Sequence, residues 1–177
     1  MATYERFTDK ARRVLMLSQQ LAAERGHFID AEHMLEALAA TEGIGSKVLA
    51  EAKLNPDVLR ERMLGEHPAV DRQRPSEALA SFGIDVNEVQ REVADVHGEN
   101  AARMAGDSQP PFSVEGKRTL EQCIRAMTEL GHEHIGTEHL LLAVLSQRDS
   151  VATQVIRDLG ADSAALEARV RELVSQV

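Results

Sequence analysis

The spacing of apolar residues along this chain predicts helices joined by short turns. In the second half, Leu120, Cys123 and Met127 recur at intervals of three and four, as on the buried face of an amphipathic helix. Few stretches are β-branched, and alanine and leucine favour helix. Read along the chain, the pattern predicts helices over 8–25, 30–40, 45–52, 56–64, 113–130, 136–145 and 151–159, and from 162 or 163 to 174.

The two halves of the chain repeat one another. The stretch GHFIDAEHMLEAL (26–38) returns, with a one-residue gap, as GHEHIGTEHLLL (131–142). This indicates a tandem duplication of a unit of roughly 65 residues. The sequence therefore predicts an all-α fold of two tandem four-helix repeats, over 1–64 and 112–177, within a single compact domain. An offset of 105 residues (131 − 26) aligns Phe7 with Phe112, Thr8 with Ser113, Leu15 with Leu120, and Ser18 with Cys123.

The segment over 65–111 separates the repeats. It holds four of the five prolines, at positions 68, 75, 110 and 111. Asp85 and Glu88 form a pair that resembles a capping box, and valines follow at helical spacing. We expect an inserted helical segment here, a helix pair flanked by loops at about 65–76 and 99–111.

Net charge and cysteine content indicate which partners and which compartment suit this protein. The net charge of −9 argues against nucleic acid and against anionic membrane surfaces. A single cysteine excludes an internal disulfide and favours a reducing compartment. No apolar run is long enough to span a membrane, and the first residues lack the apolar stretch of a signal peptide. The expected location is the cytoplasm.

The histidine-rich turn raises the possibility of a metal site formed by His132, His134 and His139 with Glu138. These residues lie across a helix end, a turn and a helix start, whereas helical ligand pairs usually stand at i and i+4. The first repeat has Phe28-Ile29 in the turn that holds His134. We therefore predict no metal and no cofactor.

Signs of catalysis are weak as well. No G-x-S-x-G motif is present, and Cys123 falls on the predicted buried face, where a small core residue is the simpler interpretation. The segment GIGSKV (43–48) does not match the G-x-x-x-x-G-K-[ST] phosphate loop. The sequence therefore predicts a protein that is not an enzyme.

A structural role explains most of the repeated motif. Gly-His ends one helix in each repeat, and Asp30 or Gly136-Thr137 begins the next. Glu32 and Glu138 fall in the first turn, where a carboxylate opposes the positive end of the helix dipole. If exposed, the same carboxylates suit a guanidinium ligand. Both interpretations of the glutamates stay open.

Two runs of the sequence resemble a known family. FTDKARRVL followed by GH and AEHML, and FS with KRTL followed by GHEHIGTEHLLL, resemble the double repeat of the Clp ATPase N-terminal domain, with the ClpC branch closest. The resemblance covers nearly all of the chain outside 65–108. It implies an all-helical, pseudo-two-fold module without enzymatic activity. Such modules recruit substrates and adaptor proteins to an AAA+ unfoldase, which delivers them to the ClpP peptidase.

The resemblance also implies binding residues. In some ClpC relatives the glutamate of each repeat binds the guanidinium of a phosphorylated arginine, which maps to Glu32 and Glu138. The phosphate would lie near Arg6, Thr8 and Ser113. At the second repeat Pro111 stands at the position equivalent to Arg6, and in the first repeat Asp30-Ala31 stands where the motif has Gly-Thr, so both repeats depart from the pattern.

A second implied surface is apolar. In ClpC relatives, aromatic residues at the start of each repeat line a groove that binds cyclic peptide antibiotics. The matching positions are Tyr4 and Phe112, with Lys10 and Lys117 beside them. A hydrophobic staple that fixes the entry of the chain into the helix is the alternative role for the two aromatic residues.

The functional hypothesis is a protein- and peptide-binding module of the Clp unfoldase-protease system. It would bind substrates, adaptors or peptide-like ligands and would regulate or protect the ClpC unfoldase. No Walker motif occurs, and the insert is longer than the ClpC linker, which favours a stand-alone homologue. The alternative is the substrate-recruiting N-terminal domain of a longer Clp ATPase.

Overall fold

A computed structural model describes residues 3–65 and 110–176, and within these ranges the protein is all-α. Its only extended pairings there are two isolated β-bridges. The predicted fold class is confirmed. The elements are η1 (Thr3–Arg6), α1 (Asp9–Arg25), α2 (Ala31–Ala40), α3 (Ile44–Glu51), α4 (Pro56–Gly65), α8 (Val114–Glu129), α9 (Thr137–Ser146), α10 (Val151–Asp158) and α11 (Ser163–Val174).

Short polar side chains cap the starts of α1 and α8, and glycines follow the ends of both helices. The Thr8 hydroxyl accepts the amide of Ala11 at 3.2 Å, and the Ser113 hydroxyl accepts the amide of Gly116 at 2.8 Å. These contacts satisfy amides that have no partner within the helix. At the other ends, Gly26 and Gly131 adopt φ of 65° and 69°, a left-handed conformation that glycine adopts without steric cost.

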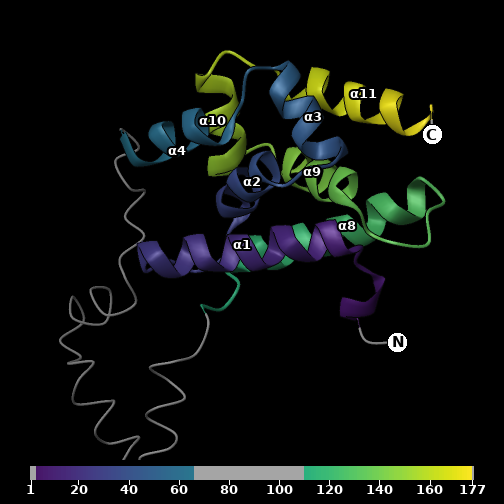
Figure 1. Cartoon of the computed structure of the whole chain (residues 1–177), viewed down its shortest axis with the longest axis horizontal. Helices are drawn as coiled ribbons and strands as arrows, with labels where there is room; N and C mark the ends of the chain where they lie inside the picture. The colour runs from purple at the N-terminus through teal and green to yellow at the C-terminus, as the bar shows by residue number, and fades with distance from the viewer. Residues whose placement is uncertain (1–2, 66–109, 177) are drawn as a thin grey trace, which may run out of the picture.

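Helices α2 and α9 form the centre of the fold. All residues over 31–38 are buried, and so are those over 139–145. Figure 1 shows α1 and α8 on one side of this central pair and α3, α4, α10 and α11 on the other. A helix that is apolar around most of its circumference needs cover on every side. The two repeats supply that cover jointly, and their helices share one core.

The segment before the first helix of each repeat pairs with the backbone of the other repeat. Before α1, the Thr8 amide donates to the carbonyl of Ile135 at 2.9 Å, and the Ile135 amide donates to the carbonyl of Arg6 at 2.7 Å. Before α8, the Ser113 amide donates to Ile29 at 3.0 Å, and the Ile29 amide donates to Pro111 at 2.9 Å. Each repeat therefore begins its first helix against the second helix of the other repeat.

Ion pairs at the opposite side of the fold follow the same symmetry. Arg169 of α11 binds Glu51 of α3, with Nε 2.7 Å from Oε2. Arg62 of α4 binds Asp158 of α10 at 3.0 Å. Both residues of the first pair lie 107 positions from their equivalents in the second (158 − 51 and 169 − 62). The duplication thus extends to individual contacts between the repeats.

The predicted helices agree with those observed to within about two residues at their ends, the usual uncertainty of helix boundaries. The predicted helix pair between the repeats falls on 66–109, outside the described residues. The boundaries 1–64, 65–111 and 112–177 therefore stay predictions. None of the described helices is long and apolar enough to cross a membrane.

Candidate functional site

A groove of about 390 Å³ lies where three helices begin. Two of them, α1 and α3, belong to the first repeat, and α9 belongs to the second. Because the leading segment of α1 pairs with the segment before α9, the two repeats build the groove together. The residues that line it are Thr8, Asp9, Lys10, Gly43, Ile44, Gly136, Thr137 and Glu138.

Glycine allows α3 to reach this junction. A Cβ placed on Gly43 would lie 3.0 Å from Cγ2 of Thr137, closer than side chains normally approach. The Gly45 amide donates to the Thr137 hydroxyl at 3.2 Å, which holds the start of α3 against the start of α9. The position of α3 in the groove thus depends on small residues in the first repeat and a threonine in the second.

The groove combines both signs of charge. Helix N-termini present amide hydrogens and the positive end of the helix dipole, which attract anions. The side chain of Lys10 is exposed at this edge and adds a full positive charge. Glu138, with 17% of its side chain exposed, and Asp9, with 91% exposed, supply carboxylates. A ligand that carries a cation and an anion close together would match this arrangement.

The carboxylate of Glu138 lies directly over Gly136. A Cβ added to Gly136 would meet its Oε2 at 2.6 Å. The other carboxylate oxygen, Oε1, is 3.3 Å from Nδ1 of His139. The absence of a side chain at position 136 therefore lets Glu138 fold back onto the start of its own helix.

His139 holds the turn beneath the groove. Its Nδ1 accepts the amide of Gly136 at 2.8 Å, and its Nε2 lies 3.0 Å from Nδ1 of His132. Burial and, to a smaller extent, the neighbouring His132 together lower the pKa of His139 to about 4. The ring is therefore neutral at pH 7. Since Nδ1 accepts a hydrogen bond, the proton resides on Nε2 and is donated to His132. This confirms the structural role expected for these histidines.

The same geometry speaks against a metal centre. His132, Glu138 and His139 place one possible ligand atom each within 4.8 Å of one another, while His134 is exposed in the turn and lies outside that group. A metal on Nε2 of His139 would move the ring proton to Nδ1, where it would face the Gly136 N–H. Two donors would then oppose each other in a buried site. The residues do not fit a metal ion.

The first repeat keeps the cap but changes its surroundings. His33 Nδ1 accepts the amide of Asp30 at 3.2 Å, and the rings of His27 and His33 are 5.7 Å apart in an edge-to-face contact. Glu32 has only 8% of its side chain exposed. Glu32 is thus largely buried, because α2 is buried from its first turn, and its role as a guanidinium ligand stays a prediction.

The other predicted residues fall in different places. Thr8 and Lys10 line the groove, while Arg6 is exposed in η1 just before it. Ser113 caps α8, and Lys117 is exposed on that helix. The residues that the resemblance implied therefore fall into two groups, one at the start of α1 and the other at the start of α8.

The two aromatic residues expected to line a groove do not occupy equivalent positions of the repeat. Phe112 is half-buried, forms a bridge with Ile29 and packs against the core, a staple-like role. Its equivalent by the repeat is Phe7, which is 5% exposed. Tyr4 lies in η1, and its side chain is outside the described residues. Whether Tyr4 and Phe112 bind a peptide stays a prediction.

Sequence reasoning missed the contribution of α3. From the sequence, GIGSKV is tested as a phosphate loop and a helix is predicted from Gly45, whereas Gly43 and Ile44 line the groove by close helix packing. Gly136 was interpreted as a helix start, and its role in admitting the carboxylate of Glu138 was not foreseen. The signal for both was a glycine directly before the first residue of a helix.

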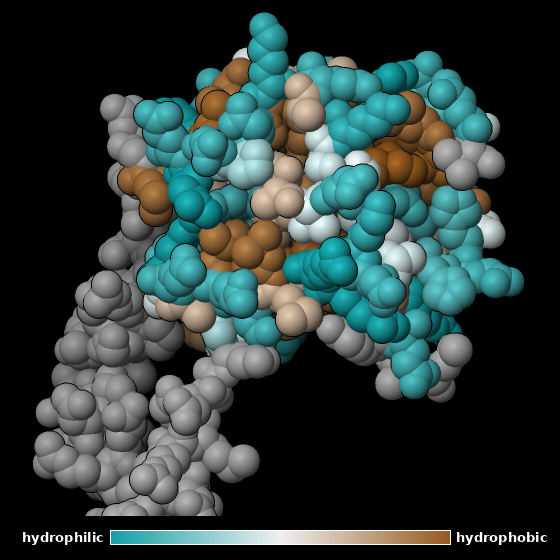
Figure 2. All heavy atoms as spheres, viewed as in Figure 1, coloured by the Kyte–Doolittle hydropathy of each residue, from teal (hydrophilic) through white to brown (hydrophobic). Residues whose placement is uncertain are grey.

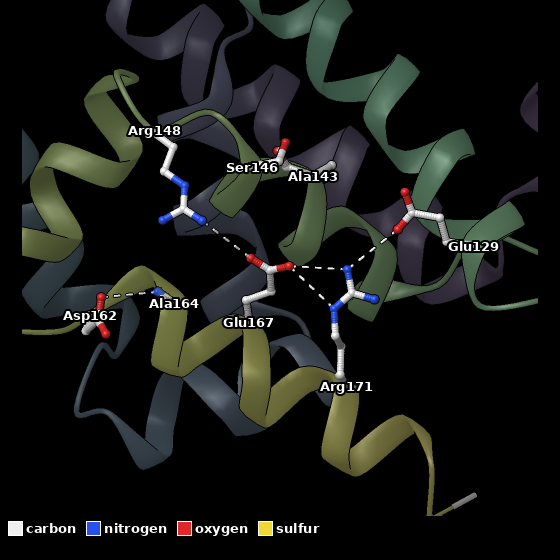
Figure 3. Close-up of polar contacts among 8 residues, drawn as sticks. All are labelled: Glu129, Ala143, Ser146, Arg148, Asp162, Ala164, Glu167 and Arg171. Atoms are coloured by element: carbon white, nitrogen blue, oxygen red, sulfur yellow. Dashed lines mark hydrogen bonds and ion pairs between the residues drawn. The ribbon is translucent and has the colours of Figure 1, made fainter.

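A second charged cluster lies over α8, α9 and α11 (Figure 3). Arg171 contacts Glu129 at 3.6 Å and Glu167 at 3.2 Å, and Arg148 reaches Glu167 at 4.0 Å. Each charge in this cluster contacts an opposite charge. The ion pairs therefore join α11 to α8 and to the loop after α9. Over the face seen in Figure 2, hydrophilic side chains alternate with separate apolar patches.

Comparison with known proteins decides the family. The model of the Clp repeat (R) N-terminal domain matches residues 6–78, 70–159 and 128–177. The chain belongs to this family. Its Clp repeats are 32% identical over 177 residues to chaperone protein ClpC2, chloroplastic, of Arabidopsis thaliana, covering 99% of the chain and 15% of that relative. Chaperone protein ClpC, chloroplastic, of Pisum sativum matches at 32% identity over 99% of the chain and 16% of its own length.

Solved structures share the fold of this Clp repeat domain. The N-terminal domain of the caseinolytic protease associated chaperone ClpD from Arabidopsis thaliana superposes with a TM-score of 0.67 at 21% identity, over 99% of this chain and 97% of that one. The Hsp104 N-terminal domain from Candida albicans gives 0.60 at 13% identity, over 94% and 90%. The chain therefore spans a small part of its ClpC relatives, and that part is their N-terminal Clp repeat domain.

Proposed function

We propose that this chain is a non-enzymatic protein- and peptide-binding module of the Clp unfoldase-protease system. It recruits substrates or adaptors and regulates or protects the unfoldase. The observation that supports this most is the groove in which Glu138, Lys10 and three helix starts meet. Burial raises the pKa of the Cys123 thiol, which keeps the one cysteine protonated and poorly suited to nucleophilic catalysis.

The ligand chemistry proposed for the groove is a phosphorylated guanidinium, as the ClpC resemblance implied. A carboxylate binds a guanidinium through two parallel hydrogen bonds, and Glu138 is the carboxylate that reaches the groove. The phosphate would lie toward Lys10 and the amides at the start of α1. Arg6, exposed in the preceding turn, stands near enough along the chain to add charge.

The second version of the proposal places the same module at the N-terminus of a longer Clp ATPase. This version is favoured by the ClpC relatives, because the chain covers only 15–16% of their length. Both versions assign recruitment to the groove and differ only in whether the ATPase is in the same polypeptide. The proposed location is the cytoplasm, without nucleic acid, membrane or cofactor.

An affinity pull-down from the cytosol of the native cells tests the proposal. The baits are the wild-type chain, Glu138→Ala, and Glu121→Ala as a control that removes one exposed carboxylate from α8. We expect wild type and the control to retain a Clp unfoldase, an adaptor or Clp substrates, and Glu138→Ala to lose them. Equal recovery with all three baits would remove the groove from the proposal. Recovery of none of these proteins by wild type would remove the proposal itself.

A further inference from the structure

The fourth helices of the two repeats are attached to the domain by different forces. Helix α11 packs against α9 and α3, and its equivalent, α4, packs against α2 and α10 (Figure 1). We infer that α4 is a detachable helix, which opens from the domain while the other helices stay folded, because ion pairs supply most of its attachment. No described residue of α4 lines the groove, so the inference is independent of the proposed function.

The apolar contacts of α4 are few. Over 56–64, Leu59 is the one fully buried residue, Met63 is half-buried, and Leu64 is 65% exposed. Helix α11 has three buried apolar residues, Leu166, Val170 and Leu173. Each large aliphatic side chain that is buried opposes release of its helix, because release returns that side chain to water. Apolar burial therefore holds α11 more strongly than α4.

Ion pairs supply the rest of the attachment of α4. Nε of Arg60 donates to Oε1 of Glu36 in α2 at 2.9 Å, and Nη2 of Arg62 donates to Oδ2 of Asp158 in α10 at 3.0 Å. The Arg60 side chain is 54% exposed and that of Arg62 is 32% exposed. Water and dissolved ions therefore reach both pairs from the arginine side, and salt weakens them.

A second arginine keeps Glu36 paired when α4 leaves. Arg25, at the end of α1, contacts the other carboxylate oxygen of Glu36, Oε2, at 2.5 Å. Removing one partner from a buried ion pair is normally costly, because the remaining charge is uncompensated. Release of Arg60 avoids much of this cost, since Arg25 stays in place beside the carboxylate. The arrangement of two arginines on one carboxylate thus suits a helix that detaches.

The second repeat lacks this arrangement. The residue equivalent to Glu36 is Leu142, which is 5% exposed in α9, the helix against which α11 packs. The residue 107 positions after Arg60 (167 − 60) is Glu167, a carboxylate in place of the guanidinium. Helix α11 does keep the ion pair of Arg169 with Glu51, but that pair adds to apolar burial. The duplication has therefore left one fourth helix fixed and the other detachable.

Amide hydrogen exchange on the full chain, followed by nuclear magnetic resonance, tests the inference. The readout is the exchange rate of amides 60–64 in α4, compared with amides 167–171 in α11 and those of α2 and α9. Amides exchange through the lowest-energy opening that exposes them. We expect α4 to exchange at least about tenfold faster than the other three helices, and a rise from about 0.05 M to about 1 M NaCl to speed α4 several-fold further.

Two matched variants separate local opening from unfolding of the whole domain. Arg60→Gln breaks the pair with Glu36 and should speed exchange over 60–64 by roughly fivefold, as for loss of one partly exposed ion pair. Arg169→Gln breaks the pair with Glu51, which stays formed when only α4 opens. It should speed exchange in α11, α2 and α9 while changing the rates over 60–64 less than about twofold. Protection of α2 and α9 in both variants shows that they fold.

Three results would overturn the inference. The first is equal exchange over 60–64 and 167–171 in the wild-type chain. The second is equal acceleration of α4 and α11 by Arg169→Gln, which would show that α4 opens only when the domain unfolds. The third is an α4 whose exchange responds neither to salt nor to Arg60→Gln, which would show that ion pairs do not hold it.

Discussion

Nε2 of His139 donates a hydrogen bond to Nδ1 of His132 across 3.0 Å, and this bond links the end of α8 to the start of α9. The other nitrogen of His139 accepts the Gly136 amide at the same time. The buried imidazole of His139 thus fixes the positions of His132 and Gly136, beside the groove residue Glu138. The stability of this turn should depend on the protonation of His139.

The first prediction concerns acid. The pKa of His139 is about 4 in the folded protein, against an ordinary value of 6.5. The unfolded chain therefore binds the proton more readily, so stability is complete above about pH 6.5 and falls as the pH drops toward 4. The loss should reach roughly 3 kcal/mol below pH 4, at 1.36 kcal/mol for each unit of pKa difference. Urea denaturation at pH 7.5, 6, 5 and 4 measures it.

His139→Asn is the matched variant for this effect. The Asn side-chain oxygen can accept the Gly136 amide and so keep the cap, but it does not titrate. The variant should lose the part of the pH dependence between 6.5 and 4 that belongs to His139. A wild-type slope that survives in His139→Asn would assign the acid sensitivity to other groups.

The second prediction concerns Glu36, a carboxylate buried at 1% exposure within α2. Arg25 of α1 and Arg60 of α4 bind it at 2.5 and 2.9 Å. The equivalent position in the second repeat is Leu142, which needs no charged partner. Glu36→Ala should lower the free energy of unfolding by about 3 kcal/mol, because it leaves buried Arg25 without its counter-charge. The triple change Arg25→Met, Glu36→Leu, Arg60→Met should recover much of this in urea denaturation.

Gly136 provides the third prediction. Its backbone, with φ of −100°, suits any residue, so Gly136→Ala should change the free energy of unfolding by less than about 1 kcal/mol. The added Cβ would displace the carboxylate of Glu138. Recovery of partners in the pull-down should therefore fall while the melting temperature stays near that of wild type. A large loss of stability with normal partner recovery would show that Gly136 is needed for folding and not for the position of Glu138.

Cys123 allows the fourth prediction. The thiol is fully buried, and burial raises its pKa. Iodoacetamide should alkylate it only through unfolding, so the rate should rise with urea in parallel with the loss of helix. Ser18 occupies the equivalent position and donates to the Val14 carbonyl at 2.7 Å, so Cys123→Ser should fold. Fast alkylation of the native protein would show that the helix face is open.

The sequence was sufficient to predict the helices, the repeat and a structural role for the histidines. All three depend on local patterns: helical spacing, glycine ends and short polar caps. The groove depends on contacts between repeats, such as Thr8 with Ile135 and Gly45 with Thr137, which are distant in the chain. Local patterns carry no information on such pairings.

The burial of Glu32 shows the same limit. Glu32 and Glu138 occupy the same place in the motif, and the first turn of a surface helix would expose both. Asp30 in one repeat and Gly136 in the other give the two carboxylates different surroundings. The side chain two residues earlier, together with the depth of α2 in the core, decides that Glu138 and not Glu32 lines this groove.

Site-specific photo-crosslinking tests the central claim, that partners bind at the groove beside Glu138. A photoreactive phenylalanine derivative replaces Asp9, which lines the groove, or Val114, which occupies the equivalent exposed position at the start of α8. Both proteins are irradiated in native cytosol. The account predicts crosslinks to Clp components or their substrates from position 9 and none from position 114. Crosslinks from position 114 alone, equal crosslinks from both, or none from position 9 would contradict it.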